Sequence, residues 1–415
     1  MGESRPWLGE PGLIFSDAAA YADPDTWHEI AARIRKDTPL LRVERDGCEP
    51  FWAVTRHADV WHVERHAELF ANAPSPVLGN VRPDPLADSP PVRTLVQMDG
   101  DAHRAHRALI SAWFKPGSVR RLTESIDALA RRSVDEMAAR GDTCDFAQDV
   151  AAYFPLRVIL SILGLPESDF PRMLRLTQEL FGADDPDFQR IAEDDQMLAV
   201  IADFFQYFTQ VTADRRATPG TDLASVIANA QIDDRPLDDL ETFGFYLLIA
   251  TAGHDTTSTA IAGGLLALLQ HPDELARLRA DPELIDRAAD EIVRWVSPVK
   301  HFMRTAQEAT QVGDTEIAAG DWLLLSYQSA NRDELAFVEP FRFDVGRTDA
   351  DRHLGFGFGA HYCLGAHLAR LEIRAVFREL VSRLDHIELA GDLTFVEGTL
   401  VSGPKHLPVQ YSIRS

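Results

Sequence analysis

The chain has 415 residues, 45% of them hydrophobic, and a formal net charge of -24. Such a chain can bury a large core, and its negative charge opposes binding to nucleic acid or anionic membranes. Three cysteines, no signal-like N-terminus and no uninterrupted apolar span argue against a secreted or membrane protein, so we expect a cytoplasmic protein without membrane insertion.

The first elements along the chain are short strand-like runs, LLRV near Leu40 and FWAVT at Phe51–Thr55. A segment with six prolines, residues 74–91, follows them and cannot form a regular helix or a central strand. A loop of this length either connects elements or covers a binding site. Both roles stay open at this point.

One long helix is predicted from about Leu237 to Gln270, and its middle is apolar on nearly every face, so it should be buried. This stretch nevertheless holds the charged Asp255 beside Thr256 and Thr257. A buried carboxylate is unfavourable unless a partner compensates it. Asp255 is therefore a candidate functional residue.

The C-terminal part contains further strand-like runs, WLLLS at Trp322–Ser326 and LPVQYSI near the C-terminus. Most of the remaining chain has helical spacing, and no repeat or Gly/Ser linker divides it. We therefore predict a mainly α fold with small β-sheets, as a single domain over residues 1–415. Its β-rich part is expected near residues 39–56, 302–326 and 387–413.

Cys363 lies between a glycine-rich turn and a predicted helix from about Leu364 to Leu380. The start of a helix offers unpaired N–H groups and the positive end of the dipole, and both stabilise a thiolate. The glycines permit a tight turn with little bulk, so a flat cofactor could approach the sulfur. The alternative is a buried structural thiol, which we assume for Cys48 and Cys144.

A zinc site is a further alternative for Cys363. Zinc requires additional cysteine or histidine ligands at close spacing, and the nearby His361 and His367 lack this paired pattern. A single thiolate suits haem iron, where it is the only protein ligand.

The run FGFGAHYCLG, from Phe356 to Gly365, resembles the haem-binding loop of the cytochrome P-450 family. The aromatic residue, the glycines, a basic residue and the cysteine are all in place. The resemblance implies a fold shaped like a triangular prism, with a long central helix over haem b. It also implies that Cys363 binds the iron and that Phe356, Gly357 and Gly365 contact the haem.

The run ATAGHDTT, residues 250–257, is similar to the family's oxygen-activation motif. Ala252 and Gly253 remove bulk where dioxygen would bind, and a Thr256 hydroxyl can bond a carbonyl one turn back and open the helix. The resemblance implies that Asp255 and Thr256 are a catalytic pair that relays protons. A helix distortion with an incidental acid is the alternative.

Glu291 and Arg294, in DEIVRW, lie three positions apart on one helical face and match the family's Glu-x-x-Arg pair. In the family, an arginine in the loop before the cysteine completes the cluster, and Arg342 in PFRFDVGR is our candidate. The role of these three residues would be structural, because the cluster would hold the cysteine loop.

His103 and Arg107, in DAHRAHR, lie four positions apart on a predicted helix and project to the same side. They match the family's His-x-x-x-Arg, which binds a haem propionate, and Arg304 and His361 match the other propionate partners. Each cation alone could be a surface charge. Four cations with one shared anionic target favour the propionate role.

These motifs occur in the family's order from about Pro39 to Val409. Five stretches are similar to the bacterial terpineol-oxidising branch of the family: IATAGHDTT, RWVSPVKHFMRTA, LLSYQSANRDE, RHLGFGFGAHYCLG and SGPKHLPV. The resemblance implies a monoterpenoid or an alkyl-aromatic hydrocarbon as the substrate. A steroid or sterol side chain is the alternative.

Six mostly apolar residues are candidates for the substrate pocket: Leu248 and Thr251 on the long helix, Val299 and Phe302 before Arg304, and Val77 and Leu78 in the proline-rich loop. Their character indicates a small hydrophobic substrate that is positioned by shape. Each of them could equally be an ordinary core residue.

The resemblance implies that the haem uses O2 and two electrons to hydroxylate an unactivated C–H bond. It points to a [2Fe-2S] ferredoxin with an NADH-dependent flavoprotein reductase as electron source, and to a monomer. Arg370, Arg374 and Arg378 fall four apart and form a basic stripe that could dock an acidic partner. Pairing of this stripe with Glu372 and Glu379 is equally possible.

Two rival functions exist for the same cofactor. A peroxide-driven enzyme is disfavoured because Asp255 and Thr256 are present. A haem sensor or carrier without turnover would need no proton relay in its longest helix. NADH-driven product formation with ferredoxin and reductase would separate the three functions.

Overall fold

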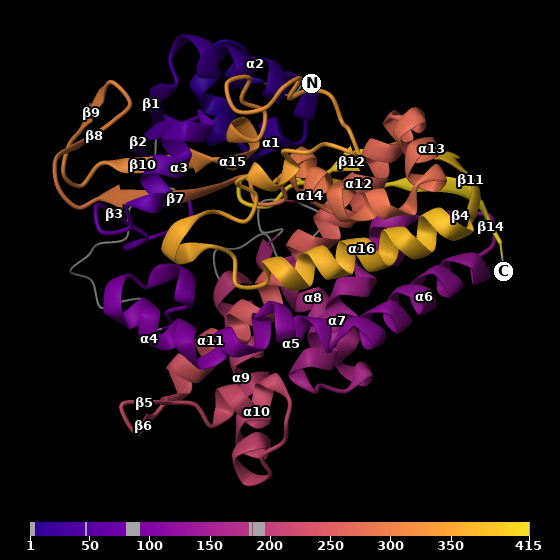
Figure 1. The fold of residues 1–415 in the computed structure, drawn as a ribbon. Helices are drawn as coiled ribbons and strands as arrows, with labels where there is room; N and C mark the ends of the chain where they lie inside the picture. The colour runs from indigo at the N-terminus through magenta and orange to yellow at the C-terminus, as the bar shows by residue number, and fades with distance from the viewer. Residues whose placement is uncertain (1–4, 46–47, 80–91, 182–184, 186–195, 415) are drawn as a thin grey trace.

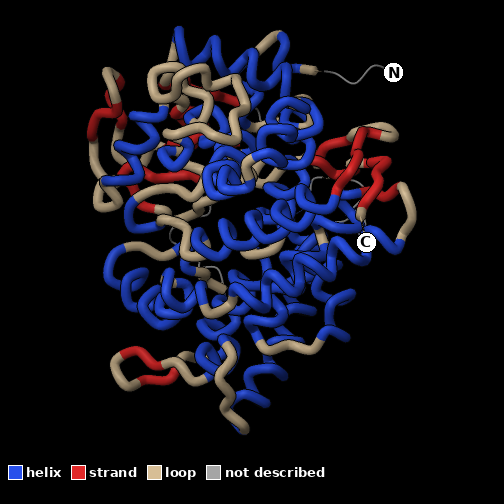
Figure 2. The backbone as a smooth tube through the Cα atoms, turned by 45° about the vertical axis from the view of Figure 1, so that its right-hand side comes forward, coloured by secondary structure: helices blue, strands red, loops and turns tan. Residues whose placement is uncertain are grey.

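The computed structural model describes residues 5–45, 48–79, 92–181, 185 and 196–414. Helices form most of the molecule, and the small sheets lie at its sides (Figure 1). Figure 2 shows the strands in separate groups, one beside the N-terminal helices and another close to the C-terminus. The predicted mainly α fold with small β-sheets is confirmed.

Within the described ranges, ten α-helices precede the central helices: α1 (Ala18–Tyr21), α2 (Pro24–Asp37), α3 (His57–Arg65), α4 (Gly100–Ser111), α5 (Pro116–Arg120), α6 (Thr123–Ala139), α7 (Tyr153–Leu163), α8 (Phe170–Phe181), α9 (Gln196–Ala217) and α10 (Leu223–Ala228). The other described α-helices are α11 (Asp239–Ala252), α12 (Asp255–Gln270), α13 (Pro272–Ala280), α14 (Ile285–Val296), α15 (Tyr327–Ala330) and α16 (Ala366–Arg383). The helix predicted after Cys363 is α16, which extends slightly further than expected.

The main sheet joins strands from distant parts of the chain: β1 (Leu40–Arg45), β2 (Cys48–Val54), β10 (Trp322–Ser326), β7 (His301–Ala306) and β3 (Phe70–Ala71), in this spatial order. The smaller sheets contain β4 (Thr143–Asp145), β11 (Leu384–Leu389) and β14 (Pro408–Ile413), then the pairs β5 (Gln231–Ile232) with β6 (Arg235–Pro236), β8 (Thr310–Val312) with β9 (Thr315–Ile317), and β12 (Thr394–Phe395) with β13 (Pro404–His406). The strands predicted near Leu40, Phe51 and Trp322 are confirmed.

The pairing of β10 determines which side chains of β7 face the interior. β10 is parallel to β2 and antiparallel to β7, with Leu323 opposite both Trp52 and Arg304. Arg304 is only 3% exposed, although it is charged. The sheet therefore holds a guanidinium inside the molecule, where it needs an anionic partner.

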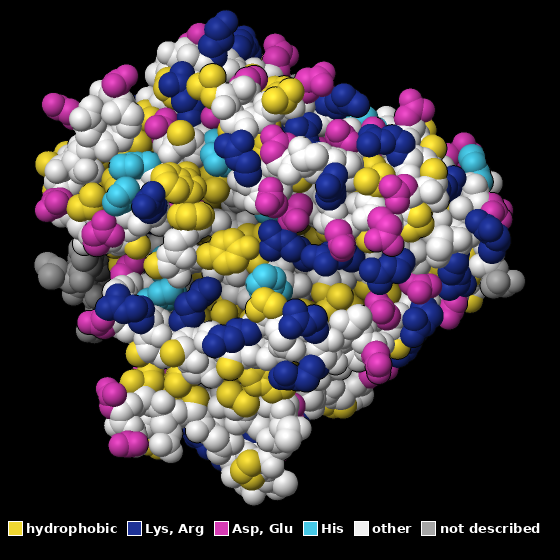
Figure 3. Space-filling view, viewed as in Figure 1, with side chains coloured by type: hydrophobic (Ala, Val, Ile, Leu, Met, Phe, Trp, Pro, Cys, Tyr) yellow, Lys and Arg dark blue, Asp and Glu magenta, His cyan; other side chains and the backbone are white. Residues whose placement is uncertain are grey.

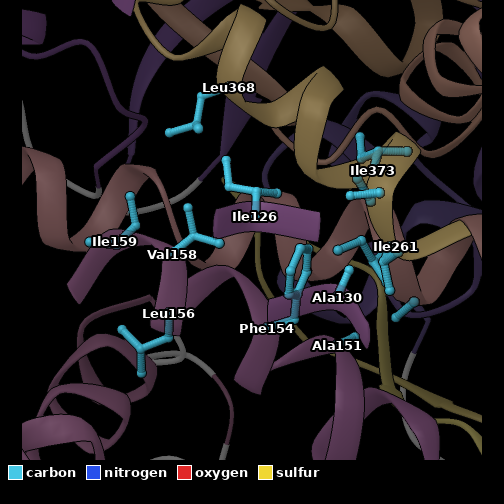
Figure 4. Packing of buried hydrophobic residues seen from close by; sticks show 14 of the residues in the cluster. Ile126, Ala130, Ala151, Phe154, Leu156, Val158, Ile159, Ile261, Leu368 and Ile373 are labelled. Atoms are coloured by element: carbon cyan, nitrogen blue, oxygen red, sulfur yellow. The ribbon is translucent and has the colours of Figure 1, made fainter. Parts of the chain in front are cut away.

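The largest hydrophobic core lies among the helices, and Figure 4 shows part of it, with Ile126 and Ala130 of α6, Ile261 of α12 and Ile373 of α16. Glycines let α12 approach its neighbours closely. A Cβ added at Gly264 would lie 2.9 Å from both Ile292 of α14 and Phe377 of α16. α12 is thus held at the centre of the core between these two helices.

The long helix expected from about Leu237 to Gln270 is interrupted, which corrects the prediction. α11 begins at a capping box formed by Asp238 and Glu241, and it ends before Gly253. Three contacts replace regular helix bonds at the break. Gly253 packs against Ile159, and a Cβ on this glycine would lie 2.5 Å from the Ile159 side chain. Thr256 Oγ1 donates to the Ala252 carbonyl at 2.8 Å. The His254 ring forms hydrogen bonds with Thr177 and with the Ala152 carbonyl. The predicted Thr256 bond is therefore present.

Candidate functional site

A cavity lies where α4, α7, the α11–α12 break, β7 and the start of α16 meet. Its volume is about 220 Å³, and it is partly open to solvent. Its wall is mostly apolar and includes Ile159, Leu248, Val299, Phe302, Leu364 and Leu368. Cys363, four basic side chains and two carboxylates interrupt this apolar wall, so the cavity combines a hydrophobic interior with a few placed polar groups.

The loop before α16 directs Cys363 into the cavity. The Cys363 N–H donates to the Phe356 carbonyl at 2.8 Å, which closes a tight turn through Gly357 and Gly359, both with positive φ (65° and 71°). A Cβ at Gly359 would lie 2.5 Å from the backbone carbonyl oxygen of Glu64 on α3. Glycine is therefore required for both the conformation and the close approach.

The protonation of Cys363 depends on two opposing effects. The thiol is open to the cavity but enclosed by protein, and burial raises its pKa. The backbone N–H groups of Gly365 and Ala366 and the guanidinium groups of Arg107 and Arg370 act in the opposite direction. A bound metal cation would deprotonate the thiol outright, so this position suits a thiolate ligand.

The four predicted propionate partners all line the cavity. The rings of His103 and His361 lie 4.1 Å apart, and Arg107 Nη2 donates to the Tyr362 carbonyl at 2.6 Å. Burial lowers the pKa of His103 to about 4 and also lowers that of His361. The cluster is therefore dense and desolvated, and an anion would stabilise it.

Arg304 is paired with a carboxylate that no sequence motif indicated. Its Nη2 lies 3.1 Å from Glu64 Oε1, which also accepts a 2.5 Å bond from the Tyr327 hydroxyl. Burial raises the pKa of Glu64 even though Arg304 and Tyr327 lower it. The backbone of Phe358 also acts on this carboxylate, and Glu64 lines the cavity. Spacing along the chain gave no signal for this residue.

Glu372 is the second carboxylate that lines the cavity. Burial raises its pKa well above the usual range, and its Oε2 has no hydrogen-bond partner. A signal for its burial was available in the sequence. Glu372 follows the buried Leu368 by four positions and precedes the buried Val376 by four, so it shares the interior face of α16.

The α11–α12 break supplies the cavity face opposite Cys363. Ala252, Gly253 and Thr256 all line the cavity, as the oxygen-activation motif predicts. Asp255 does not line it. Its carboxyl faces the ring of His254, with 3.3 Å between Asp255 Oδ1 and His254 Nδ1. Burial raises the pKa of Asp255, and His254 lowers it.

Three of the six predicted pocket residues line the cavity, namely Leu248, Val299 and Phe302. Thr251 does not line it, and its hydroxyl donates to the Leu247 carbonyl one turn back in α11. Leu78 packs instead against the N-terminal core cluster, and Val77 lies outside the cavity wall. Residues 80–91 of the proline-rich loop lie outside the described ranges.

The buried Glu-x-x-Arg cluster contains Arg347 rather than the predicted Arg342. Arg294 donates to Glu291 at 2.6 and 2.8 Å, and Arg347 Nε donates to the same carboxylate at 3.2 Å. The side chain of Arg342 is 55% exposed and pairs with Glu339, and only its backbone carbonyl joins the cluster. Both arginines occur in one loop, and the loop path decides which of them turns inward.

The basic stripe of α16 is paired with acids of other helices: Arg370 with Asp290 at 2.6 Å, Arg374 with Asp286 at 3.1 Å and Arg378 with Asp127 at 3.6 Å. The alternative of pairing with Glu372 and Glu379 is wrong, since Glu372 faces the cavity and Glu379 lies 4.0 Å from Arg131. Figure 3 shows Lys and Arg side chains gathered along this face, with acidic side chains beside them.

The donor set fits an iron porphyrin. A thiol provides one metal ligand, the apolar walls suit a flat macrocycle, and the basic cluster suits its carboxylates. Among the described residues, no group of three or more His, Cys, Asp and Glu side chains could hold a metal ion. In the same part of the chain, no helix has the length and apolarity that a membrane crossing requires.

Comparison with known proteins agrees with this site. Residues 50–407 match the cytochrome P-450 family model. Cytochrome P-450-terp from Pseudomonas sp is 41% identical, over 94% of this chain and 95% of that protein. Linalool 8-monooxygenase from Pseudomonas putida is 33% identical, over 98% of each chain, and Steroid C26-monooxygenase from Mycolicibacterium smegmatis is 32% identical, over 92% and 90%.

Among solved structures, CYP108D1 from Novosphingobium aromaticivorans superposes with a TM-score of 0.88 and is 38% identical, with 98% of each chain covered. The predicted fold and the resemblance to the branch represented by P-450-terp are confirmed. The chain belongs to the cytochrome P-450 family and is a haem-iron monooxygenase.

Proposed function

We propose that the protein hydroxylates an unactivated C–H bond of a small hydrophobic substrate, a monoterpenoid or an alkyl-aromatic hydrocarbon, with O2 and two electrons from a ferredoxin. One observation carries this proposal. The Cys363 thiol, four basic side chains and a broken helix with small residues border the same apolar cavity. This combination suits metal chemistry on a substrate that lacks polar functional groups.

Haem b is the proposed cofactor, and when bound it supplies the iron at which O2 is reduced and the substrate is oxidised. Cys363 would hold the iron, while Phe356, Gly357 and Gly365 would lie against the macrocycle. His103, Arg107, Arg304 and His361 would bind its carboxylates: all four line the cavity. The buried triad of Glu291, Arg294 and Arg347 would keep the cysteine loop in place.

Proton delivery is assigned to Asp255 and Thr256. The Thr256 hydroxyl is bonded to the Ala252 carbonyl at 2.8 Å and lines the cavity, so it can present a proton or orient a water there. Asp255 follows the break, and burial raises its pKa. A carboxyl with a raised pKa holds its proton more readily than an exposed one and can serve as an acid. Ala252 and Gly253 leave room for a small ligand beside the pair.

The substrate would be selected by shape. Leu248, Val299 and Phe302 present apolar surface to the cavity. Two of the relatives carry names that refer to terpenoids, which favours a monoterpenoid. A steroid side chain is the second candidate, because the steroid C26-monooxygenase and the linalool enzyme have nearly the same sequence identity to this chain.

Electrons would come from a [2Fe-2S] ferredoxin and an NADH-dependent flavoprotein reductase in the cytoplasm, with the protein acting as a monomer. The partly exposed Arg374 and Arg378 support docking of an acidic partner near the cysteine loop. Their acidic neighbours weaken the local positive potential, so the contact would be transient.

The test is a ligand screen followed by turnover. Monoterpenoids, alkylbenzenes and sterols are added to the ferric holoprotein, and the low-spin to high-spin shift of its absorption spectrum is measured. Compounds that bind are then incubated with NADH, ferredoxin and reductase, and products are identified. Hydroxylated terpenoid or alkylbenzene supports the proposal, and product from sterols alone supports the alternative. Ligand binding without any NADH-driven product would favour a sensor or carrier.

A further inference from the structure

His254 lies in the break between α11 and α12 and is only 1% exposed. Both ring nitrogens have partners outside their own helix. His254 Nε2 lies 2.8 Å from the backbone carbonyl of Ala152, and Nδ1 lies 3.0 Å from the hydroxyl of Thr177 on α8. Nδ1 also lies 3.3 Å from Oδ1 of Asp255. The ring is therefore fixed with one edge against the acid of the proposed relay.

The partners determine where protons can reside. A carbonyl oxygen only accepts, so Nε2 carries a hydrogen in every state that keeps the bond to Ala152. The Thr177 hydroxyl lies within 3.0 Å of both His254 Nδ1 and the Leu174 carbonyl. It can donate to the carbonyl and accept from Nδ1, or donate to Nδ1. Thr177 consequently tolerates Nδ1 either with or without a hydrogen.

Two proton arrangements satisfy every partner. In the first, Nδ1 is protonated and donates toward an ionised Asp255 and toward Thr177. In the second, Nδ1 is bare, Asp255 is neutral, and the carboxyl donates to the single lone pair of this nitrogen while the Thr177 hydroxyl donates to the Leu174 carbonyl. If both groups lose this proton, a lone pair faces a carboxylate in a buried site, which is unfavourable. The geometry therefore lets the pair hold one proton at either of two positions, on Nδ1 or on the Asp255 carboxyl.

We propose that His254 is the positioning residue of the relay: its Nδ1 holds one proton jointly with Asp255 and passes this proton to the acid for delivery. In the transfer, the Nδ1–H bond breaks, an Oδ1–H bond forms and the imidazole becomes neutral; after delivery, the pair takes up a new proton from bulk water. The role rests on the proposed function, since it assigns the source of the proton that Asp255 and Thr256 deliver. Asp255 Oδ2 has no hydrogen-bond partner, so the carboxyl has one oxygen free for a second contact.

Among the described residues, His254 is the charged group that acts on the Asp255 carboxyl, where burial raises the pKa and the imidazole lowers it. From α8, Thr177 is neutral and Glu179, two positions later, projects about 200° away around the helix. Asp149, in the segment before α7, forms an ion pair with Arg140, with 3.1 Å between Asp149 Oδ1 and Arg140 Nη1. The titration of Asp255 should therefore respond to substitution of residue 254.

The experiment compares holoproteins of wild type, His254→Gln and His254→Asn, with Asp255→Asn to assign the carboxyl signal. Infrared difference spectra across a pH series report the protonated Asp255 carboxyl directly, without turnover. Without the imidazole, burial acts alone, so we expect the neutral carboxyl to persist to higher pH in both His254 variants. For a shift of one pKa unit, NADH-driven product formation should fall by about tenfold at the wild-type optimum, with more electrons lost to hydrogen peroxide.

The matched control is His271→Gln, at the other end of α12, where the ring bonds the Ala267 carbonyl and contacts Trp295 edge to face. It should leave the carboxyl titration unchanged. An identical Asp255 titration in wild type and both His254 variants would overturn the inference. The proposed function fails differently, because wild type itself would then give no NADH-driven product. Retention of the haem spectrum by the variants excludes simple misfolding.

Discussion

Arg347 and Arg342 belong to the same loop but differ in burial, so alanine substitution of each tests the assignment of the buried cluster. Arg347 is 7% exposed and donates to the Glu291 carboxylate and to the carbonyls of Val338, Glu339 and Arg342, at 2.7 to 3.2 Å. Removing one partner of a buried ion pair costs about 3–5 kcal/mol, because the remaining charge and carbonyls are left without compensation.

The size of the thermal shift follows from chain length. An unfolding entropy of about 2.1 cal/mol/K per residue over 415 residues gives ~0.9 kcal/mol/K. Arg347→Ala should therefore lower the midpoint by about 3–6 °C. Arg342→Ala removes an exposed pair with Glu339, for which about 0–1 kcal/mol and a shift of about 1 °C are expected.

The assay is thermal unfolding of the holoproteins at one scan rate, followed by circular dichroism and by the haem absorption. The single-domain organisation of residues 1–415 stays a prediction, and coincident transitions in the two signals would support it. Equal shifts for the two variants, or a larger shift for Arg342→Ala, would refute the assignment of Arg347 to the cluster.

Three further predictions concern the cavity and the partner surface. Gly359→Ala should sharply reduce haem incorporation, measured as the haem-to-protein absorbance ratio, because its Cβ would lie 2.5 Å from the Glu64 carbonyl at a φ of 71°; normal incorporation would contradict the close approach of this turn to α3. Burial raises the pKa of Glu372, so above the ordinary glutamate pKa its carboxyl is neutral in the folded protein but ionised in the unfolded chain. Its contribution to folding stability is therefore full below the ordinary pKa and is lost as pH rises above it. Glu372→Gln should therefore gain about 1.4 kcal/mol per pH unit relative to wild type in this window, measured by unfolding at several pH values, and a constant difference would argue against the raised pKa. Replacing both Arg374 and Arg378 by Glu should slow reduction by an acidic ferredoxin at low salt in stopped flow, while unchanged rates would exclude this face.

The sequence was most informative where chemistry depends on local spacing. The Cys363 loop, the His103 and Arg107 pair and the Thr256 bond each involve residues within a few positions, so their geometry follows from helix and turn rules. Arg304 and His361 join them in the cavity although they are distant in sequence, and the resemblance to the family anticipated this.

The predictions were wrong where contacts between distant parts of the chain determine the local structure. Nothing local distinguishes Arg347 from Arg342, since the path of the loop around Glu291 selects the inward side chain. The break at Gly253 depends on Ile159, Ala152 and Thr177 from other helices, which a periodic pattern cannot reveal. Glu64 is buried because α3 packs against the cysteine loop, and its own helix carries no sign of this contact.

The central claim is that the sulfur of Cys363 binds the iron. It is tested most directly by the absorption spectrum of the reduced protein with carbon monoxide, compared between wild type and Cys363→Ser. We predict a strongly red-shifted Soret band in wild type, as a thiolate ligand produces, and loss of this band in the variant. The same red-shifted band in both proteins, or its absence from the haem-loaded wild type, would contradict the account.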